Sequence, residues 1–388
     1  MTGLPPAAWT QRADLAAMVA ALGKDQARYV GGAVRDTLLG IAVKDVDVAT
    51  PLVPSDVMAR LRKAGIRTVP TGIDHGTITA LLAEGPVEIT TLRHDVSTDG
   101  RRATVAYASD WRDDAARRDF TINALYADPR THEIFDWFGG LDDLAARRVR
   151  FIGDARQRIR EDHLRILRYF RFQARFGSQP ADMASENACA ELAPTLKGLS
   201  RERVGMETMN LLGLADPAPT VARMAHLGVL AQILPDADTD ALARLVEEED
   251  RQGIAPDPLR RLAALLPPDP ALAEQAASRF RLSGAQKKRL VLAAGRVADN
   301  AGDPRALAYR IGRDGALDRL LLTASDTSVL RGWPIPALPV KGADVIAAGV
   351  TAGPQVARVL KAVEAQWIAE GFPGEGRVRE LLTQAVAS

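Results

Sequence analysis

The chain has 388 residues, a formal net charge of +1 and one cysteine, Cys189. This length allows two or more domains, and no apolar run approaches the roughly 20 residues that cross a membrane. A single cysteine excludes an internal disulfide, and the first residues lack a basic region followed by an apolar core. These features predict a soluble, helix-rich, cytoplasmic protein without membrane contact, and the bulk charge does not indicate a nucleic-acid binder.

The first informative stretch covers residues 29–50, YVGGAVRDTLLGIAVKDVDVAT. It begins with the end of a short apolar strand, followed by Gly31 and Gly32. Because glycine has no β-carbon, a phosphate group can approach the main chain closely there. A short helical segment that carries Arg35 comes next.

Asp45 and Asp47 follow in a segment that alternates with valine, which predicts a strand with both carboxylates on one face. Adjacent carboxylates repel each other unless a cation lies between them, and oxygen ligands suit Mg²⁺. Alone, a glycine pair is usually a turn and an Asp-x-Asp is usually solvated surface. In this order and spacing they indicate nucleotidyl transfer assisted by metal ions.

GGAVRD, LLG and KDVD together resemble the class II tRNA nucleotidyltransferase (CCA-adding enzyme) and bacterial poly(A) polymerase branch of the nucleotidyltransferase superfamily. The resemblance is specific through residue 177 and looser afterwards. It implies an enzyme that adds or repairs the 3′-terminal CCA of tRNA from CTP and ATP. In this interpretation Asp45 and Asp47 hold two Mg²⁺ ions, while Gly32, Arg35 and Arg118 contact the triphosphate.

Residues 87–93, VEITTLR, are β-branched and alternating, which predicts a further strand. Glu88 lies on one face of it. The resemblance implies that Glu88 is a third carboxylate beside Asp45 and Asp47, whereas the sequence alone leaves a surface acid equally open.

The polar loop at residues 94–101, HDVSTDGR, comes directly after this strand. The resemblance implies a flexible element that assists the switch from adding C to adding A. Asp95, Asp99 and Arg101 are the matching residues, although ordinary loop chemistry explains the same letters.

The second signature is residues 117–126, RRDFTINALY, which predict a short helix. Asn123 follows Asp119 by four residues, so the two side chains can share a face. With Arg118 they form a set that can hold a triphosphate oxygen and ribose hydroxyls, and the resemblance implies this role. A helix cap is the alternative for Asp119.

The third signature lies at residues 154–177, where the pattern predicts one uninterrupted helix. Ten arginines and three acids occur between residues 147 and 175, and a solvated helix face is the plain alternative for such a run. The resemblance implies that Asp162 and Arg165 select the base of CTP or ATP through its Watson–Crick edge. Arg168 and Arg171 then lie nearer the phosphates or brace the helix.

The pattern as a whole predicts an α+β protein, with a small N-terminal nucleotidyltransferase α/β head that contains a mixed sheet, followed by helices only. The expected divisions are a catalytic head at 1–150, a neck with the base-selecting helix at 151–215, a helical body at 216–330 and a helical tail at 331–388. The resemblance implies that the tRNA acceptor end and elbow are the partners and that the tail contacts tRNA. No DNA partner is expected.

Four alternatives remain open at the level of sequence. Poly(A) polymerase shares all three signatures, but the stretch at residues 69–73, VPTGI, lacks the basic segment typical of that group. An enzyme that adds only CC or only A is the second. A catalytically silent tRNA-binding protein is the third. A small-molecule nucleotidyltransferase, which would not need the arginine-rich helix, is the fourth.

Overall fold

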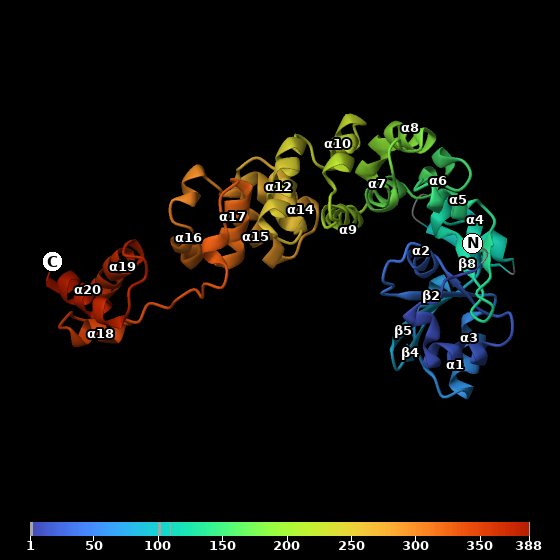
Figure 1. The fold of residues 1–388 in the computed structure, drawn as a ribbon, viewed down its shortest axis with the longest axis horizontal. Helices are drawn as coiled ribbons and strands as arrows, with labels where there is room; N and C mark the ends of the chain where they lie inside the picture. The colour runs from blue at the N-terminus through green and yellow to red at the C-terminus, as the bar shows by residue number, and fades with distance from the viewer. Residues whose placement is uncertain (1–2, 100–101, 109, 388) are drawn as a thin grey trace. The chain divides into compact units, whose positions relative to one another are not determined.

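The computed structural model of the chain describes residues 3–99, 102–108 and 110–387. It divides into two compact units, which are treated separately below. The first unit comprises Met1–Glu207 and Arg223–Ile233, and the second comprises Thr208–Ala222 and Leu234–Ser388. In Figure 1 the strands of the first unit are blue to green and the helices of the second unit are yellow to red.

A seven-stranded sheet forms the centre of the first unit, in the order β3-β4-β5-β2-β1-β8-β9, and β6 and β7 form a separate hairpin. Strands β2 and β5 run parallel, and the other neighbours in the large sheet are antiparallel. The sheet is therefore mixed, as predicted. The strands are β1 (Arg28–Val30), β2 (Val46–Thr50), β3 (Arg67–Gly72), β4 (Thr77–Leu82), β5 (Gly85–Thr91), β6 (Arg93–Asp99), β7 (Arg102–Tyr107), β8 (Leu125–Ala127) and β9 (Ile134–Asp136).

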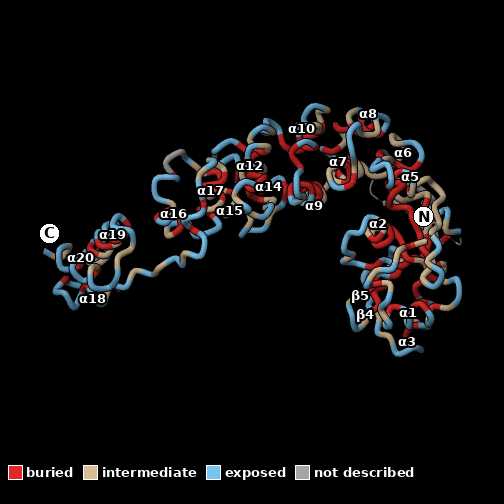
Figure 2. Tube along the Cα trace, viewed as in Figure 1, coloured by how far each residue is buried: buried red, intermediate tan, exposed pale blue. Residues whose placement is uncertain are grey.

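Helices pack on this sheet and then take over the chain. The helices up to residue 212 are α1 (Ala13–Leu22), α2 (Gly32–Leu38), α3 (Pro54–Lys63), α4 (Trp111–Ala116), α5 (Gly140–Ala145), α6 (Ala155–Glu161), α7 (Arg165–Phe176), α8 (Met183–Leu192) and α9 (Arg201–Leu212). Helix α2 contacts β1, β2 and β8, while α3 contacts β3 and β4. Val30 of β1 and Val48 of β2 are buried. Figure 2 colours the buried residues of the chain red.

The predicted uninterrupted helix at residues 154–177 is wrong. Helix α6 ends at Glu161 and α7 begins at Arg165. Asp162 between them has φ −151° and ψ 105°, an extended conformation that no helix contains. The sequence carries no glycine or proline at this point, so local propensity did not reveal the break.

The rest of the chain is helical in the described residues. The later helices are α10 (Ala218–His226), α11 (Leu230–Ile233), α12 (Thr239–Gln252), α13 (Pro258–Leu265), α14 (Pro270–Arg279), α15 (Gly284–Ala294), α16 (Pro304–Ile311), α17 (Arg313–Leu322), α18 (Gly342–Ala347), α19 (Pro354–Ala369) and α20 (Glu375–Ala387). The predicted α+β architecture is confirmed. Within the described ranges, no helix is both long enough and apolar enough to cross a membrane.

Helix α13 begins as its sequence predicts. The Asp257 side chain accepts hydrogen bonds from the amides of Leu259 (2.9 Å) and Arg260 (3.0 Å), and Pro258 occupies the first helical position. An aspartate cap satisfies amides that have no partner within the helix, and proline loses nothing there because its missing N–H is not needed. The helix ends at Leu265, before the Pro267-Pro268 pair.

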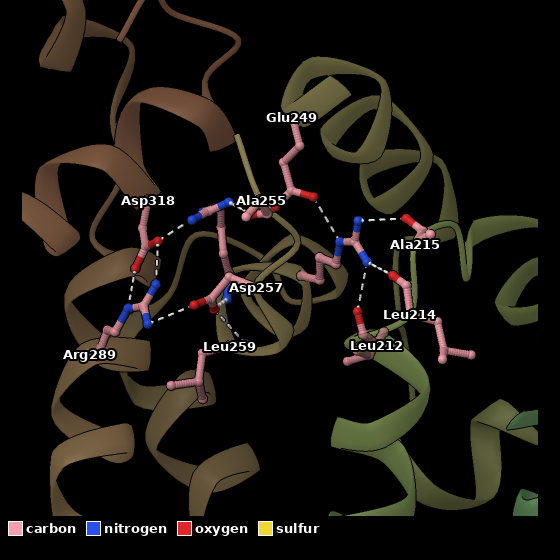
Figure 3. A network of polar contacts seen from close by, with 11 residues as sticks. Leu212, Leu214, Ala215, Glu249, Ala255, Asp257, Leu259, Arg289 and Asp318 are labelled. Carbon is pink, nitrogen blue, oxygen red and sulfur yellow. Dashed lines mark hydrogen bonds and ion pairs between the residues drawn. The ribbon is translucent and has the colours of Figure 1, made fainter. Parts of the chain in front are cut away.

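A buried network of ion pairs holds α13 against its neighbours in the second unit. Arg260 contacts Glu249 on α12 at 2.6 Å and Asp318 on α17 at 2.9 Å. Arg261 contacts the other oxygen of Glu249 at 2.8 Å, and Arg289 on α15 contacts Asp318 at 2.7 Å. Figure 3 shows the carboxylates between these guanidinium groups. Four helices are thereby joined through charges that are largely buried, of which Arg289, with 26% of its side chain exposed, is the most accessible.

Arg261 also satisfies main-chain groups. Its guanidinium donates to the carbonyl oxygens of Leu212 (2.8 Å) and Ala215 (2.9 Å), and also to that of Leu214. These carbonyls lie at and just after the end of α9, where the helix itself supplies no donor. The buried arginine therefore provides the cap that the local sequence lacks.

Replacing Glu249 by glutamine should destabilise the second unit. The substitution removes the charge shared by Arg260 and Arg261, and breaking a buried ion pair from one side costs about 3–5 kcal/mol. Urea denaturation followed by circular dichroism measures the free energy of unfolding. Glu247→Gln, at an exposed position on the same helix, is the control and should change it by about 0.5 kcal/mol or less. Equal effects of the two variants would contradict this account of the network.

Candidate active site

Asp47 and Glu88 lie opposite each other on adjacent parallel strands. The register pairs Val46 with Val87, Asp47 with Glu88 and Val48 with Ile89. Paired residues of neighbouring strands point to the same side of a sheet, so the two carboxylates share one face. Val46 and Val48 are buried on the other face, while Asp47 and Glu88 are exposed. Asp45 directly precedes β2, two residues before Asp47.

The pKa of Asp47 is affected by the other acids that lie close to it. Its pKa is raised, first because surrounding protein atoms partly desolvate the carboxylate and then by the negative charges of Glu88 and Asp45, while Arg118 acts in the opposite direction. Three carboxylates and one arginine therefore lie close enough to affect one another. The arrangement has a local excess of negative charge, which a bound cation would relieve.

The donor atoms at this position are carboxylate oxygens, which suit a hard divalent cation. In the part of the chain that the structure describes, no three His, Cys, Asp or Glu side chains converge well enough to hold a metal ion alone. Asp45 and Asp47 would therefore supply only part of a coordination shell. Such sites are completed by water and by the phosphates of a substrate.

Gly31 lies at the edge of this carboxylate group, at the start of α2. Its φ of +67° lies in a region that residues with a β-carbon rarely adopt. A β-carbon there would be 3.2 Å from Nη1 of Arg118. Its amide already donates to the carbonyl of Leu125. Gly31 is thus required by its backbone conformation and by the close approach of Arg118, and Gly32 follows as the first residue of the helix.

Arg35, which the resemblance assigns to the triphosphate, is bonded to other protein groups. It is buried, and its guanidinium contacts Asp36 at 2.6 Å and donates to Oδ1 of Asn123 at 2.5 Å. The same group lies 4.2 Å from the ring centroid of Phe176. These contacts direct Arg35 into the protein. Its contact with a triphosphate stays a prediction.

Asp119 and Asn123 meet, as their spacing predicts. Asn123 Nδ2 donates to Asp119 Oδ1 at 3.0 Å, although a short 3₁₀ turn, η3 (Thr121–Asn123), brings them together rather than an α-helix. Asp119 does not cap this turn, which follows Phe120. Its other oxygen accepts two hydrogen bonds from Arg168 on α7, at 2.5 and 2.8 Å. Burial would raise the pKa of Asp119, but Arg168 and Asn123 outweigh it and hold that pKa below its usual value.

The arginines of α7 are largely occupied by acids from other elements. Arg171 contacts Glu207 on α9 at 2.6 Å, and Arg168 lies 3.6 Å from the same carboxylate. Glu207 is buried. Arg35, Asn123, Asp119, Arg168 and Glu207 therefore form one continuous chain of polar contacts, which we call the Asp119 network.

Asp162 and Arg165 do not pair with each other. Asp162 contacts Arg203 on α9 at 2.7 Å and accepts a hydrogen bond from the amide of Leu164 at 3.1 Å. Arg165 contacts Glu161 at 2.7 Å. Asp162 and Arg165 thus form no ion pair within one helix, because the helix break at Asp162 turns its side chain toward α9.

Arg203 and Glu207 are the residues to which the sequence assigned no part in the site. They are four residues apart on α9, so they share a face, and both are charged. This spacing of charged residues could have marked them as candidate site residues from the sequence. Their partners lie 36 to 41 positions away in the chain, so the pairing itself could not be predicted from local pattern.

Asp95 and Asp99 of the predicted flexible loop belong to strand β6, which pairs with β7. Their side chains, and Arg101 as a whole, lie outside the described residues.

The chain is similar to known proteins over most of its length. Residues 27–150 match the family described as "Poly A polymerase head domain", and residues 182–240 match "Probable RNA and SrmB- binding site of polymerase A". Human "CCA tRNA nucleotidyltransferase 1, mitochondrial" is 36% identical over 377 residues, which cover 90% of this chain and 84% of that protein. The "CCA-adding enzyme" of Levilactobacillus brevis is 33% identical over 375 residues, with 90% and 91% covered.

A solved structure is similar along almost the whole length. The CCA-adding enzyme of Bacillus stearothermophilus in complex with CTP superimposes with a TM-score of 0.73 at 26% identity, and 96% of each chain is covered. The CCA-adding enzyme of Thermotoga maritima, complexed with tRNA, has a TM-score of 0.70 at 20% identity, with 93% of this chain and 91% of that chain covered. This second likeness concerns the fold alone.

Replacing Glu207 by glutamine should weaken the Asp119 network. The change leaves Arg171 without its buried counter-charge and removes the second acid beside Arg168, and we expect a loss of about 3 kcal/mol in the free energy of unfolding. Urea denaturation measures it.

Glu191→Gln is the matched control, because Glu191 pairs with Arg156 at 2.7 Å on the surface, with both side chains more than 40% exposed. Exposed pairs contribute about 1 kcal/mol or less. A loss at Glu207 no larger than at Glu191 would show that the network adds little stability.

Proposed function

This chain belongs to the family of CCA tRNA nucleotidyltransferases, and we propose that it adds or repairs the 3′-terminal CCA of tRNA from CTP and ATP. The observation that carries the proposal is the in-register pair of Asp47 and Glu88 beside Gly31 and Arg118. Similarity to named CCA tRNA nucleotidyltransferases over about nine tenths of the chain supports it.

Nucleotidyltransferases of this family generally use a divalent metal ion. We propose that the ion is Mg²⁺ and that Asp45 and Asp47 hold it, with phosphate oxygens and water as further ligands. Once bound, the metal would favour deprotonation of the attacking tRNA 3′-hydroxyl and stabilise charge on the leaving pyrophosphate. The excess negative charge around Asp47 supports this assignment, with Glu88 as a neighbouring catalytic carboxylate.

The reaction joins the tRNA 3′-oxygen to the α-phosphorus of the nucleotide and breaks the bond to pyrophosphate. Arg118, with part of its guanidinium open to solvent, would bind the triphosphate oxygens and neutralise their charge. Gly31 and Gly32 let the phosphates approach the backbone. Arg35, through its hydrogen bond to Asn123, would act on the site indirectly.

The sugar and the base would be read by the remaining signatures. Asp119 and Asn123 would lie near the ribose. Asp162 would accept a hydrogen bond from the exocyclic amine that C and A both carry, and Arg165 would donate to the base edge. Arg168 and Arg171 are better suited to bracing these groups, since both contact buried acids.

We also propose the four-part organisation of head, neck, body and tail with the boundaries expected from the sequence. The helices that follow the head would contact the tRNA elbow, while the acceptor end would enter the head. A cytoplasmic location is part of the proposal and is supported by the single cysteine, which is buried and free. The flexible loop at Asp95, Asp99 and Arg101 would assist the change from C to A addition.

Incorporation of labelled CTP and ATP into three tRNAs tests the proposal. The substrates lack CCA, end in C or end in CC. We expect all three to be extended to CCA and no further, and chelation of the metal by EDTA should stop the reaction. Addition of A alone to the CC-ended tRNA, addition of CC alone, or long A tracts would each replace the proposal with one of its rivals.

Replacing Asp47 by asparagine should abolish incorporation, because it removes one of the two carboxylates that would hold the metal. Binding of tRNA, measured by filter retention, should persist in this variant. If the wild-type chain bound tRNA but incorporated neither nucleotide with Mg²⁺ present, a silent tRNA-binding protein would be the better description.

A further inference from the structure

Asp114 on α4 is a buried carboxylate to which neither the signatures nor the proposed mechanism assign a role. Its Oδ2 accepts a hydrogen bond from the Tyr126 hydroxyl at 2.5 Å and one from Nη2 of Arg118 at 3.4 Å. Its Oδ1 accepts a hydrogen bond from the amide of Arg93, the first residue of β6, at 3.1 Å. One side chain thus joins α4, β8, the start of the β6–β7 hairpin and Arg118.

Tyr126 strengthens this connection. Nε of Arg118 donates to the Tyr126 hydroxyl at 3.0 Å, and the guanidinium lies 5.2 Å from the centroid of the tyrosine ring. Burial raises the pKa of Tyr126 well above its usual range, so the hydroxyl keeps its proton. It therefore accepts from Arg118 and donates to Asp114, and the three groups form a directed chain.

These contacts account for two of the three guanidinium nitrogens of Arg118. Nε is bonded to Tyr126 and Nη2 to Asp114. The third nitrogen, Nη1, lies where a β-carbon on Gly31 would approach to 3.2 Å, and the charge of Arg118 reaches Asp47. The guanidinium is thereby held through Nε and Nη2, while Nη1 lies beside Gly31.

We propose that Asp114 is a positioning residue that fixes Arg118, partly through Tyr126, in the orientation that binds the triphosphate of the incoming nucleotide. The inference rests on the proposed function. A long arginine side chain loses rotational freedom when it binds a ligand. If Asp114 orders the guanidinium beforehand, less of that entropy is lost during nucleotide binding.

Asp114→Asn tests this proposal. Asparagine keeps the size of the side chain and an oxygen for the Arg93 amide, but it removes the charge that faces Arg118. We expect KM for CTP and ATP, and the inhibition constant of inorganic pyrophosphate, to rise about tenfold, as loss of a hydrogen bond to a charged group would produce. kcat should change less. Asp113→Asn, the exposed neighbour on the same helix, should leave all these values unchanged.

A double-mutant cycle separates positioning from general destabilisation. In an Arg118→Gln background, Asp114→Asn should change pyrophosphate binding less than twofold, because the group that it positions is already gone. Tyr126→Phe, which keeps the ring and removes the hydroxyl, supplies a second variant should Asp114→Asn fold poorly. It should raise the same constants by a smaller factor.

Unchanged pyrophosphate inhibition in folded Asp114→Asn and Tyr126→Phe variants would overturn the proposal. So would additive effects in the cycle, since these indicate a structural role alone. Calorimetric titration with pyrophosphate and Mg²⁺ measures binding without turnover. A wild-type chain that binds pyrophosphate but adds no nucleotide to tRNA would refute the proposed function while leaving the role of Asp114 measurable.

Discussion

The bonds between Asp119, Asn123 and Arg168 are the interaction on which the geometry of the first unit most depends. An ionised carboxylate removed from water is stable only when its oxygens are satisfied, and the loss of one partner costs about 3–5 kcal/mol. Here the partners come from the turn after α4 and from α7, so the carboxylate cannot stay paired unless both segments keep their places. Arg35 extends this dependence to α2 through Asn123. The Asp119 network therefore helps to position α2 and the glycines at its start.

Most arginines of the stretch between residues 147 and 175 are paired with acids of the protein. A run of positive charge in sequence suggests an exposed surface for phosphate. In the structure, acids meet most of these side chains, some from nearby positions and some from distant segments. The pairs are Arg148 and Arg150 with Asp143, Arg165 with Glu161, Arg156 with Glu191, Arg168 with Asp119, and Arg171 with Glu207. Much of the positive charge of this stretch is therefore neutralised by ion pairs within the protein. The bidentate geometry of arginine suits it to this use, because one guanidinium can satisfy several buried acceptors.

Local pattern predicted the pieces of the site better than their pairings. Alternation with valine located Asp45 and Asp47 at the start of a strand, and the glycine pair before them was evident from composition. The parallel register that brings Glu88 opposite Asp47 was not visible, because α3, β3 and β4 separate the two strands in the chain. Nor was the break at Asp162, which no glycine or proline marks. Its extended backbone is compensated by the contact with Arg203, a tertiary interaction across 41 positions that a periodicity of 3.6 residues cannot reveal.

The acids around the site differ in how far their charge is compensated, and this difference separates their roles. Arg168 and Asn123 more than offset the burial of Asp119, whose pKa is lowered. Asp47 has the opposite balance: desolvation and then the charges of Glu88 and Asp45 raise its pKa, and Arg118 compensates only in part. A carboxylate that protein cations already satisfy gains less from a bound metal ion than one that they do not. A carboxylate that lies next to other carboxylates gains most from binding a divalent cation together with its nucleotide. Asp47 and Glu88 thus remain as partly uncompensated negative charge on one face of the sheet, whereas Asp119 is paired with Arg168.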